Sequence, residues 1–299
     1  RPLSVYMMGP YLGAGIAMIF GAQVLEWTTE MDVIYFPILG EISAWQFTFI
    51  SVGLPGFLIA GLFLTIAEPK RTGRGLESQS VPSWSQIIQY IISKRSVYAA
   101  IILGNSALII MLYGLQSWVP TMLLRVFEWD LIQSGRVYGV VALISGSAGV
   151  LSGPFAVRYL ERRNQTAAAL KVAMAGATIS TISLAILAFS PNAELALTCV
   201  SIASFFVTFP LAGTTSAIVV VTPNEMRGVI TALYVVITSI FGLVLGPTLV
   251  ATSTDFIFQD PKAVAKSLSL VAMLVLPMGI ALMWNGSEDF ETAKKSAIS

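Results

Sequence analysis

The sequence contains no histidine and only one cysteine, Cys199, among its 299 residues. The lack of histidine excludes catalytic triads that require it, and a single cysteine cannot form an internal disulfide. Together the two shortages exclude the usual zinc sites. Charged residues are also scarce, at 11% of the chain against roughly 25% in typical soluble domains. The composition is therefore not that of an ordinary soluble enzyme.

The sequence also lacks a strongly basic character and a nucleotide-binding loop, which excludes two further classes of function. The net charge of +1 offers no basic footprint of the kind that binds nucleic acid. No G-x-x-x-x-G-K-[ST] loop for nucleotide phosphates occurs, so ATP-driven pumping by this chain is not expected. We predict neither a nucleic-acid partner nor a bound cofactor.

Long apolar runs are what the sequence has in abundance. Hydrophobic residues make up 56% of the chain, and the mean hydropathy is +0.80. Because about 20 apolar residues in a helix cross a bilayer, these runs predict membrane spans. The eight predicted spans lie at roughly 5–25, 46–67, 97–119, 132–156, 167–189, 195–218, 229–251 and 268–285. The predicted fold class is all-α and integral to the membrane.

The basic residues predict the orientation of these spans. Thirteen of the 17 lysines and arginines fall on one side of the predicted bundle. The other side holds Arg125, Arg136, Lys262 and Lys266. Since cytoplasmic loops carry the excess of basic residues, the richer side and the C-terminus are predicted to be cytoplasmic. A multi-pass protein of a cell membrane is expected, with the bacterial inner membrane as its location.

The loop over residues 68–83 is polar and rich in helix breakers, which is typical of a linker. Apolar residues then follow at helical spacing over 84–92, and Ser83 with Gln86 has the spacing of a capping box. This short amphipathic helix either lies flat on the cytoplasmic leaflet or extends the next span.

Three segments resemble the major facilitator superfamily of transporters. Residues 43–71, with Gly-Leu-Pro-Gly at 53–56, resemble its sixth helix. Residues 222–248, which begin Thr-Pro-Asn-Glu-Met-Arg-Gly, resemble its eleventh helix and are closest to the spinster-like branch. Val-Pro-Thr-Met-Leu-Leu-Arg at 119–125 also fits that branch.

The resemblance covers the whole chain and implies helices five to twelve of a twelve-helix bundle, so we expect an N-terminally truncated protein. Residues 1–67 would be the last two helices of the N-terminal lobe, and 68–95 a cytoplasmic linker with the amphipathic helix. Residues 96–287 would form the C-terminal six-helix lobe, and 288–299 a cytoplasmic tail. Similar Leu-Pro segments in the second and eighth spans agree with parallel repeats or arise by chance.

The superfamily's cytoplasmic signature, roughly G-x-L-a-D-R-x-g-R-R, is matched in part. The matching residues are Gly153, Arg158, Arg162 and Arg163. Val157 stands where the family has an aspartate that helps to latch the inner gate. Glu161 is the candidate substitute, although the family offers no warrant for that role.

Polar side chains within the spans are the candidate cavity residues. They are Asn105, Tyr113, Gln116, Tyr138, Tyr234 and Thr238. Such residues avoid lipid, so they either line a substrate cavity or form hydrogen bonds between helices. The four-residue spacing of glycines at 9 and 13, 149 and 153, and 242 and 246 predicts close helix packing.

The predicted function is secondary active transport of an amphiphilic or organic-anion solute by alternating access. The alternatives are another proton-coupled importer of small organic anions in the same superfamily, or a channel or receptor. No ionisable residue lies in the middle of any predicted span. The resemblance places the proton-coupling acid and its partner arginine in helices one and four. The expected partners are a small or lipid-like substrate, membrane lipids and protons.

Overall fold

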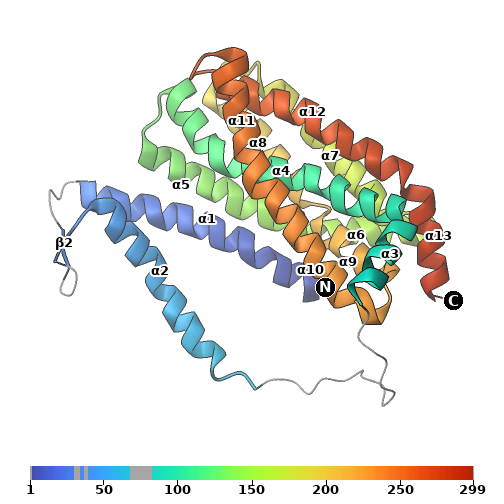
Figure 1. The fold of residues 1–299 in the computed structure, drawn as a ribbon. Helices are drawn as coiled ribbons and strands as arrows, with labels where there is room; N and C mark the ends of the chain where they lie inside the picture. The colour runs from blue at the N-terminus through green and yellow to red at the C-terminus, as the bar shows by residue number, and fades with distance from the viewer. Residues whose placement is uncertain (1, 30–33, 37–39, 68–82, 299) are drawn as a thin grey trace.

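The computed structural model describes residues 2–29, 34–36, 40–67 and 83–298. Within these ranges, eight helical stretches are long and apolar enough to cross a membrane. The all-α membrane fold and the eight predicted spans are therefore confirmed. Figure 1 shows most of the helices gathered into one elongated bundle.

Five spans are single helices. They are α1 (Pro2–Thr29), α2 (Ala44–Phe63), α4 (Arg95–Phe127), α7 (Ala168–Leu187) and α12 (Val264–Asn285).

The other three spans are interrupted. They are α5 (Leu131–Val141) with η1 (Ala142–Gly146) and α6 (Ser147–Arg162); α8 (Ala193–Thr208) with α9 (Leu211–Val221); and α10 (Asn224–Ile240) with η2 (Phe241–Leu245), α11 (Gly246–Thr252) and η3 (Ser253–Phe258). Two of the interruptions occur at Pro210 and just before Pro247, because proline lacks a backbone N–H and disrupts the helical hydrogen bonding. The π-helical segments η1, η2 and η3 were not predicted.

A short hairpin joins α1 and α2. Its strands, β1 (Ile34–Phe36) and β2 (Gly40–Ile42), are antiparallel, with Tyr35 opposite Glu41. Gly40 adopts φ +73°, which glycine tolerates without steric cost. These strands were not predicted from the sequence, because three residues show too little apolar–polar alternation to indicate a strand.

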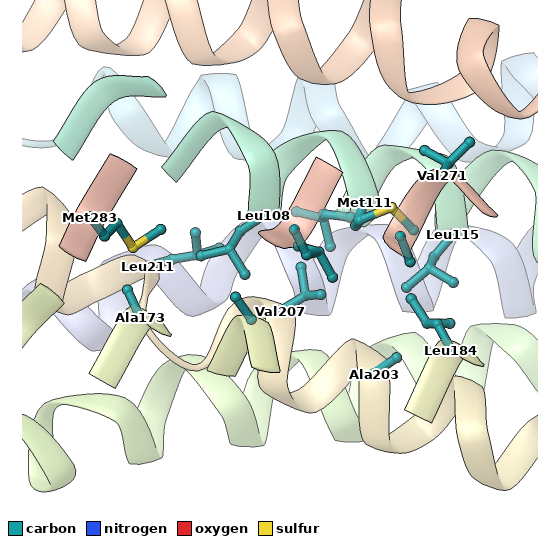
Figure 2. Close-up of a cluster of buried hydrophobic side chains, with 14 of the residues drawn as sticks. Leu108, Met111, Leu115, Ala173, Leu184, Ala203, Val207, Leu211, Val271 and Met283 are labelled. Carbon is teal, nitrogen blue, oxygen red and sulfur yellow. The ribbon is translucent and has the colours of Figure 1, made fainter. Parts of the chain in front are cut away.

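The helix α2 stands apart from the bundle, and α1 lies along α5 (Figure 1). None of the residues of α2 is buried. The remaining helices from α4 onward share one apolar core, in which Leu108 and Met111 of α4 face Val207 of α8 (Figure 2).

The helices of this core approach each other closely at glycines. A Cβ atom on Gly149 or Gly153 of α6 would overlap the carbonyl oxygens of Phe205 and Phe209, respectively. A Cβ atom on Gly246 would lie 2.6 Å from the carbonyl oxygen of Ile110 on α4. These positions therefore act in packing, as their spacing predicts.

The first glycine pair behaves differently. A Cβ atom on Gly9 or Gly13 would meet nothing within 4 Å in the described part of the chain. Gly15 is the glycine of α1 that packs closely: its Cβ would lie 2.8 Å from the carbonyl oxygen of Gly139 on α5. The close crossing of α1 and α5 therefore uses a different face of α1 from the one that carries Gly9 and Gly13.

Two short helices cover the predicted cytoplasmic end. The predicted linker falls outside the described residues over 68–82, and α3 (Trp84–Ser93) follows with Ser83 capping Gln86 as predicted. A break at Lys94 separates α3 from α4, so α3 does not extend the next span. The segment predicted as a tail forms α13 (Ser287–Ile298).

We predict opposite effects for two glycine substitutions. Gly153→Ala should destabilise the protein by about 1–3 kcal/mol, because the added Cβ would push α6 away from a backbone carbonyl. Gly228→Ala is the matched control: its Cβ would meet nothing within 4 Å, and alanine favours helix. Thermal unfolding in detergent should show a lower melting temperature for the first variant only. Equal melting temperatures would contradict this account of the α6 crossing.

Candidate functional site

A buried hydrogen-bonded cluster joins three helices of the core. The Asn105 Nδ2 atom on α4 donates to the hydroxyl of Tyr234 on α10 at 2.6 Å. The Thr214 hydroxyl on α9 donates to Asn105 Oδ1 at 3.1 Å. Asn105 and Thr214 are fully buried, and Tyr234 is 4% exposed. Both ends of the Asn105 amide therefore have protein partners, which favours an interhelical role for this residue.

Tyr113 and Gln116 lie further along the same α4 stripe and are only half-buried. Neither side chain has a hydrogen-bond partner among the residues that the structure describes. The phenol of Tyr11 lies near those of Tyr113 and Tyr234. Tyr11 belongs to α1, so this tyrosine group spans the crossing between α1 and the core.

The remaining cavity candidates are buried. Tyr138 on α5 is 1% exposed and packs into the apolar core. Thr238 on α10 is 3% exposed, and its hydroxyl donates to the carbonyl of Tyr234 in its own helix at 2.8 Å. In this arrangement, Tyr113 and Gln116 are the candidates with side-chain groups available to a ligand.

The predicted outer end of the α1–α5 crossing carries an ion pair. Arg136 Nη2 on α5 lies 2.7 Å from Glu26 Oε2 on α1, and the two side chains are 41% and 47% exposed. Gln23 accepts a second hydrogen bond from Arg136 at 3.2 Å and donates to Glu26 at 2.7 Å. Glu26 and Arg136 line part of a cavity of about 480 Å³.

The cytoplasmic signature lies at the opposite end, on α6. The side chain of Val157, at the aspartate position, packs against α9: its Cγ2 atom would lie 3.0 Å from a Cβ on Gly213. Arg158 stacks over the Phe155 ring at 4.9 Å, and Arg163 over the Tyr159 ring at 4.7 Å. Val157 supplies no charge at this position, so a charge contact of the kind that the family's aspartate makes is not available here.

Glu161 pairs with the C-terminal helix. Lys294 Nζ on α13 lies 2.8 Å from Glu161 Oε1. Glu291, one turn before Lys294, accepts a hydrogen bond from the Ala167 backbone N–H at 2.9 Å, at the start of α7. Glu161 therefore ties α6 to α13. Arg162 is exposed and has no ion pair among the described residues.

Three residues of this arrangement were not among the candidates predicted from the sequence. Tyr11, Thr214 and Glu26 are joined to predicted residues from helices far away in the sequence. No spacing rule pairs positions that are more than a hundred residues apart, as Asn105 and Thr214 are. The polarity of each residue within or beside an apolar span was the only available signal.

The described fold is that of a multi-pass membrane protein with a polar cluster inside a helical bundle. Two solved structures of a bacterial homolog to the human lysosomal transporter Spinster share this fold. The inward-facing, unoccupied form matches with a TM-score of 0.62 and 17% identity, over 98% of this chain and 70% of that one. The inward-facing, occupied form matches with a TM-score of 0.56 and 16% identity, over 98% and 67% of the chains.

The family model of the Major Facilitator Superfamily matches residues 1–247. The chain belongs to this superfamily, which places it among membrane transporters and not among enzymes, and its fold is of the spinster-like type. The probable galactarate/D-glucarate transporter GudP of Bacillus subtilis (strain 168) is 22% identical over 198 residues. That match covers 58% of this chain and 43% of the relative, less than half of its length.

A double-mutant cycle should reveal the bond between Asn105 and Tyr234. Asn105→Ala and Tyr234→Phe should each destabilise the protein, with a coupling of about 0.6–1.7 kcal/mol, because each removes the same interhelical hydrogen bond. Ser106→Ala is the control, since the Ser106 hydroxyl bonds to Ile102 of its own helix. Denaturation in detergent measures all variants. Additive effects of the first pair would show that the bond contributes nothing.

Proposed function

We propose that the protein is a secondary active transporter that moves an organic anion or an amphiphilic solute by alternating access. Membership of the superfamily supports the class of function, and the sugar-acid substrates in the name of the Bacillus relative support an organic anion. The observation that carries the proposal is the packing of α1 against the other helices. The contact of α1 with α5 holds an ion pair at one end, and Tyr11 of α1 lies near Tyr113 of α4 and Tyr234 of α10.

The proposed moving units are residues 1–67 and 96–287, joined by the linker 68–95. The second unit shares one apolar core, whereas α2 has no buried residue. The first unit meets the second at Gly15 and Gly139 and through Glu26 and Arg136. Such a contact can open at one end while glycine backbones at the crossing act as the pivot.

The proposed substrate site lies beside the tyrosine group. Tyr113 and Gln116 offer a phenol and an amide whose hydrogen-bonding groups are available, and Tyr11 approaches from α1. Phenol and amide N–H groups can donate to the hydroxyl or carboxylate oxygens of a sugar acid. The buried amide of Asn105 would support this site by holding Tyr234 in position.

The remaining parts of the proposal concern gating and coupling. The signature residues on α6 are the proposed inner gate, with the Glu161–Lys294 pair holding α13 across its cytoplasmic side. Protons are the proposed coupling ion, and the C-terminus is proposed to face the cytoplasm of a bacterial cell.

Uptake by the natural gene product in proteoliposomes tests the substrate class. D-glucarate should accumulate when a proton gradient is imposed and should be lost with a protonophore. Tyr113→Phe and Gln116→Ala should each raise KM about tenfold, because each removes a hydrogen bond to the solute. Tyr35→Phe is the control, since Tyr35 is 78% exposed in the hairpin.

A lysolipid should be tested in parallel under the same gradient. If only the lysolipid is taken up, the substrate is an amphiphile and not a sugar acid. Failure of both solutes to enter the vesicles would refute the proposed substrate classes.

The outer ion pair should bias the transporter toward closure at that end. In a Cys199→Ala background, Ala22→Cys should label slowly, because Ala22 packs against Gly135 at the crossing. Adding Arg136→Gln should raise the labelling rate about two- to fivefold, in line with the strength of a partly exposed ion pair.

A Lys262→Gln variant serves as the control for that experiment. It removes the exposed Lys262–Glu128 pair, which lies at the same end but within residues 96–287. Exchanging the charges with Glu26→Arg and Arg136→Glu should restore slow labelling. Unchanged labelling in Arg136→Gln would show that the pair does not hold the outer end closed.

A further inference from the structure

A second cavity, separate from the proposed substrate site, lies where α3 meets the turn between α9 and α10. Its volume is about 360 Å³. The lining residues are Tyr90, Lys94, Val220, Val221, Thr222, Pro223, Asn224, Arg227 and Ser296. The cavity therefore lies at the predicted cytoplasmic end of the spans.

Two tyrosines hold α3 in place as one wall of the cavity. The Tyr90 hydroxyl on α3 donates to the carbonyl of Val221 at 3.1 Å. The hydroxyls of Tyr98 and Thr222 share a hydrogen bond of 2.9 Å, and the two tyrosine rings pack edge to face at 6.2 Å. These bonds hold α3 against the α9–α10 turn, so the shape of the cavity is built into the fold.

The cavity has a cationic lining. Lys94 and Arg227 are its charged residues, and neither forms an ion pair with a carboxylate in the described part of the chain. Lys94 Nζ lies 5.4 Å from the centre of the Tyr90 ring, and Arg227 Nη2 donates to the Thr222 carbonyl at 3.3 Å. The Arg227 Nε atom is buried without a hydrogen-bond partner. Asp289 lines a neighbouring cavity with Lys94 but does not pair with it.

The α10 helix adds to this positive potential. It begins at Asn224, and no side chain caps its first turn, because the N-cap residue is Pro223. The N-terminal end of a helix dipole attracts an anion. The first-turn carboxylate, Glu225, is exposed and does not line the cavity.

An exposed apolar stripe lies beside the cavity on α3. Ile87 of this helix is buried, but Trp84, Ile88 and Ile92 remain 63%, 52% and 60% exposed. An amphipathic helix with exposed tryptophan and isoleucine next to basic residues is typical of a helix in the membrane interface. A soluble anion would contact only the cationic cavity. A lipid would contact the cavity with its headgroup and the apolar stripe with its acyl chains.

We propose that this cavity binds the phosphate of an anionic phospholipid, with the acyl chains of that lipid lying against the exposed stripe of α3. Arg227 and Lys94 would bind the phosphate oxygens, since arginine donates in a fork and lysine supplies a compact charge. The site is independent of the solute that the transporter carries. It would anchor the linker helix to one leaflet through a bound lipid.

Native mass spectrometry of the natural gene product in detergent tests this site. Phosphatidylglycerol and phosphatidylcholine with identical acyl chains are added in turn, and their dissociation constants are compared. Phosphatidylglycerol should bind the unmodified protein more tightly. The Lys94→Gln/Arg227→Gln variant should lose about tenfold or more of that affinity, because each basic residue near the surface adds to the attraction.

The matched control is Lys171→Gln/Lys295→Gln. It removes the same charge from the same end, and neither residue lines the cavity. This control should bind phosphatidylglycerol like the unmodified protein. If the first double variant unfolds, Lys94→Gln alone replaces it, because Lys94 contributes only its ring contact with Tyr90.

A water-soluble phosphate ester separates the two sources of the anion. Glycerol phosphate should not displace phosphatidylglycerol at equal concentration, and Trp84→Gln/Ile88→Gln should weaken lipid binding. Equal binding of glycerol phosphate and phosphatidylglycerol would overturn the lipid assignment. Equal lipid affinity in the unmodified protein and the Lys94→Gln/Arg227→Gln variant would overturn the site itself.

Discussion

The structure depends on helix backbones that approach each other closely at glycines. Lipid tails are as apolar as leucine, so no hydrophobic force drives one span against another within the membrane. Close packing must supply the attraction, and it does so where Gly153 meets the Phe209 carbonyl and where Gly246 meets the Ile110 carbonyl. These crossings hold the helices from α4 onward as one unit, whereas Gly15 and Gly139 form a separate contact between α1 and α5.

The polar groups inside the bundle divide into two sets because of this packing. Asn105 has both ends of its amide satisfied by Tyr234 and Thr214, so it holds helices together. Tyr113 and Gln116 lie on the same stripe but are only half-buried, and neither side chain has a hydrogen-bond partner among the described residues. A ligand gains most from groups that do not have to break an existing bond, which is why the proposed substrate site centres on this second set.

The two ends of the molecule differ in what their charges do. At the predicted outer end, Glu26 and Arg136 connect segments that are proposed to move apart. At the predicted cytoplasmic end, Glu161 and Lys294 connect the proposed unit 96–287 to α13, which would keep α13 with that unit if α1 moves as proposed. Lys94 and Arg227 pair with no described carboxylate. The predicted cytoplasmic end therefore carries two basic side chains that no described carboxylate neutralises, as the proposed lipid site requires.

The sequence by itself determined the eight spans, the cap at Ser83 and the packing role of most glycine pairs. Each of these follows from neighbours along the chain: hydrophobic length, side-chain reach within one turn, and spacing along one helical face. Only the tertiary structure decided which glycine of α1 meets α5, which carboxylate pairs with Arg136, and that Asn105 is satisfied rather than available. Those outcomes depend on residues brought together from distant helices, and their rotation about each axis is set by packing, which no local pattern encodes.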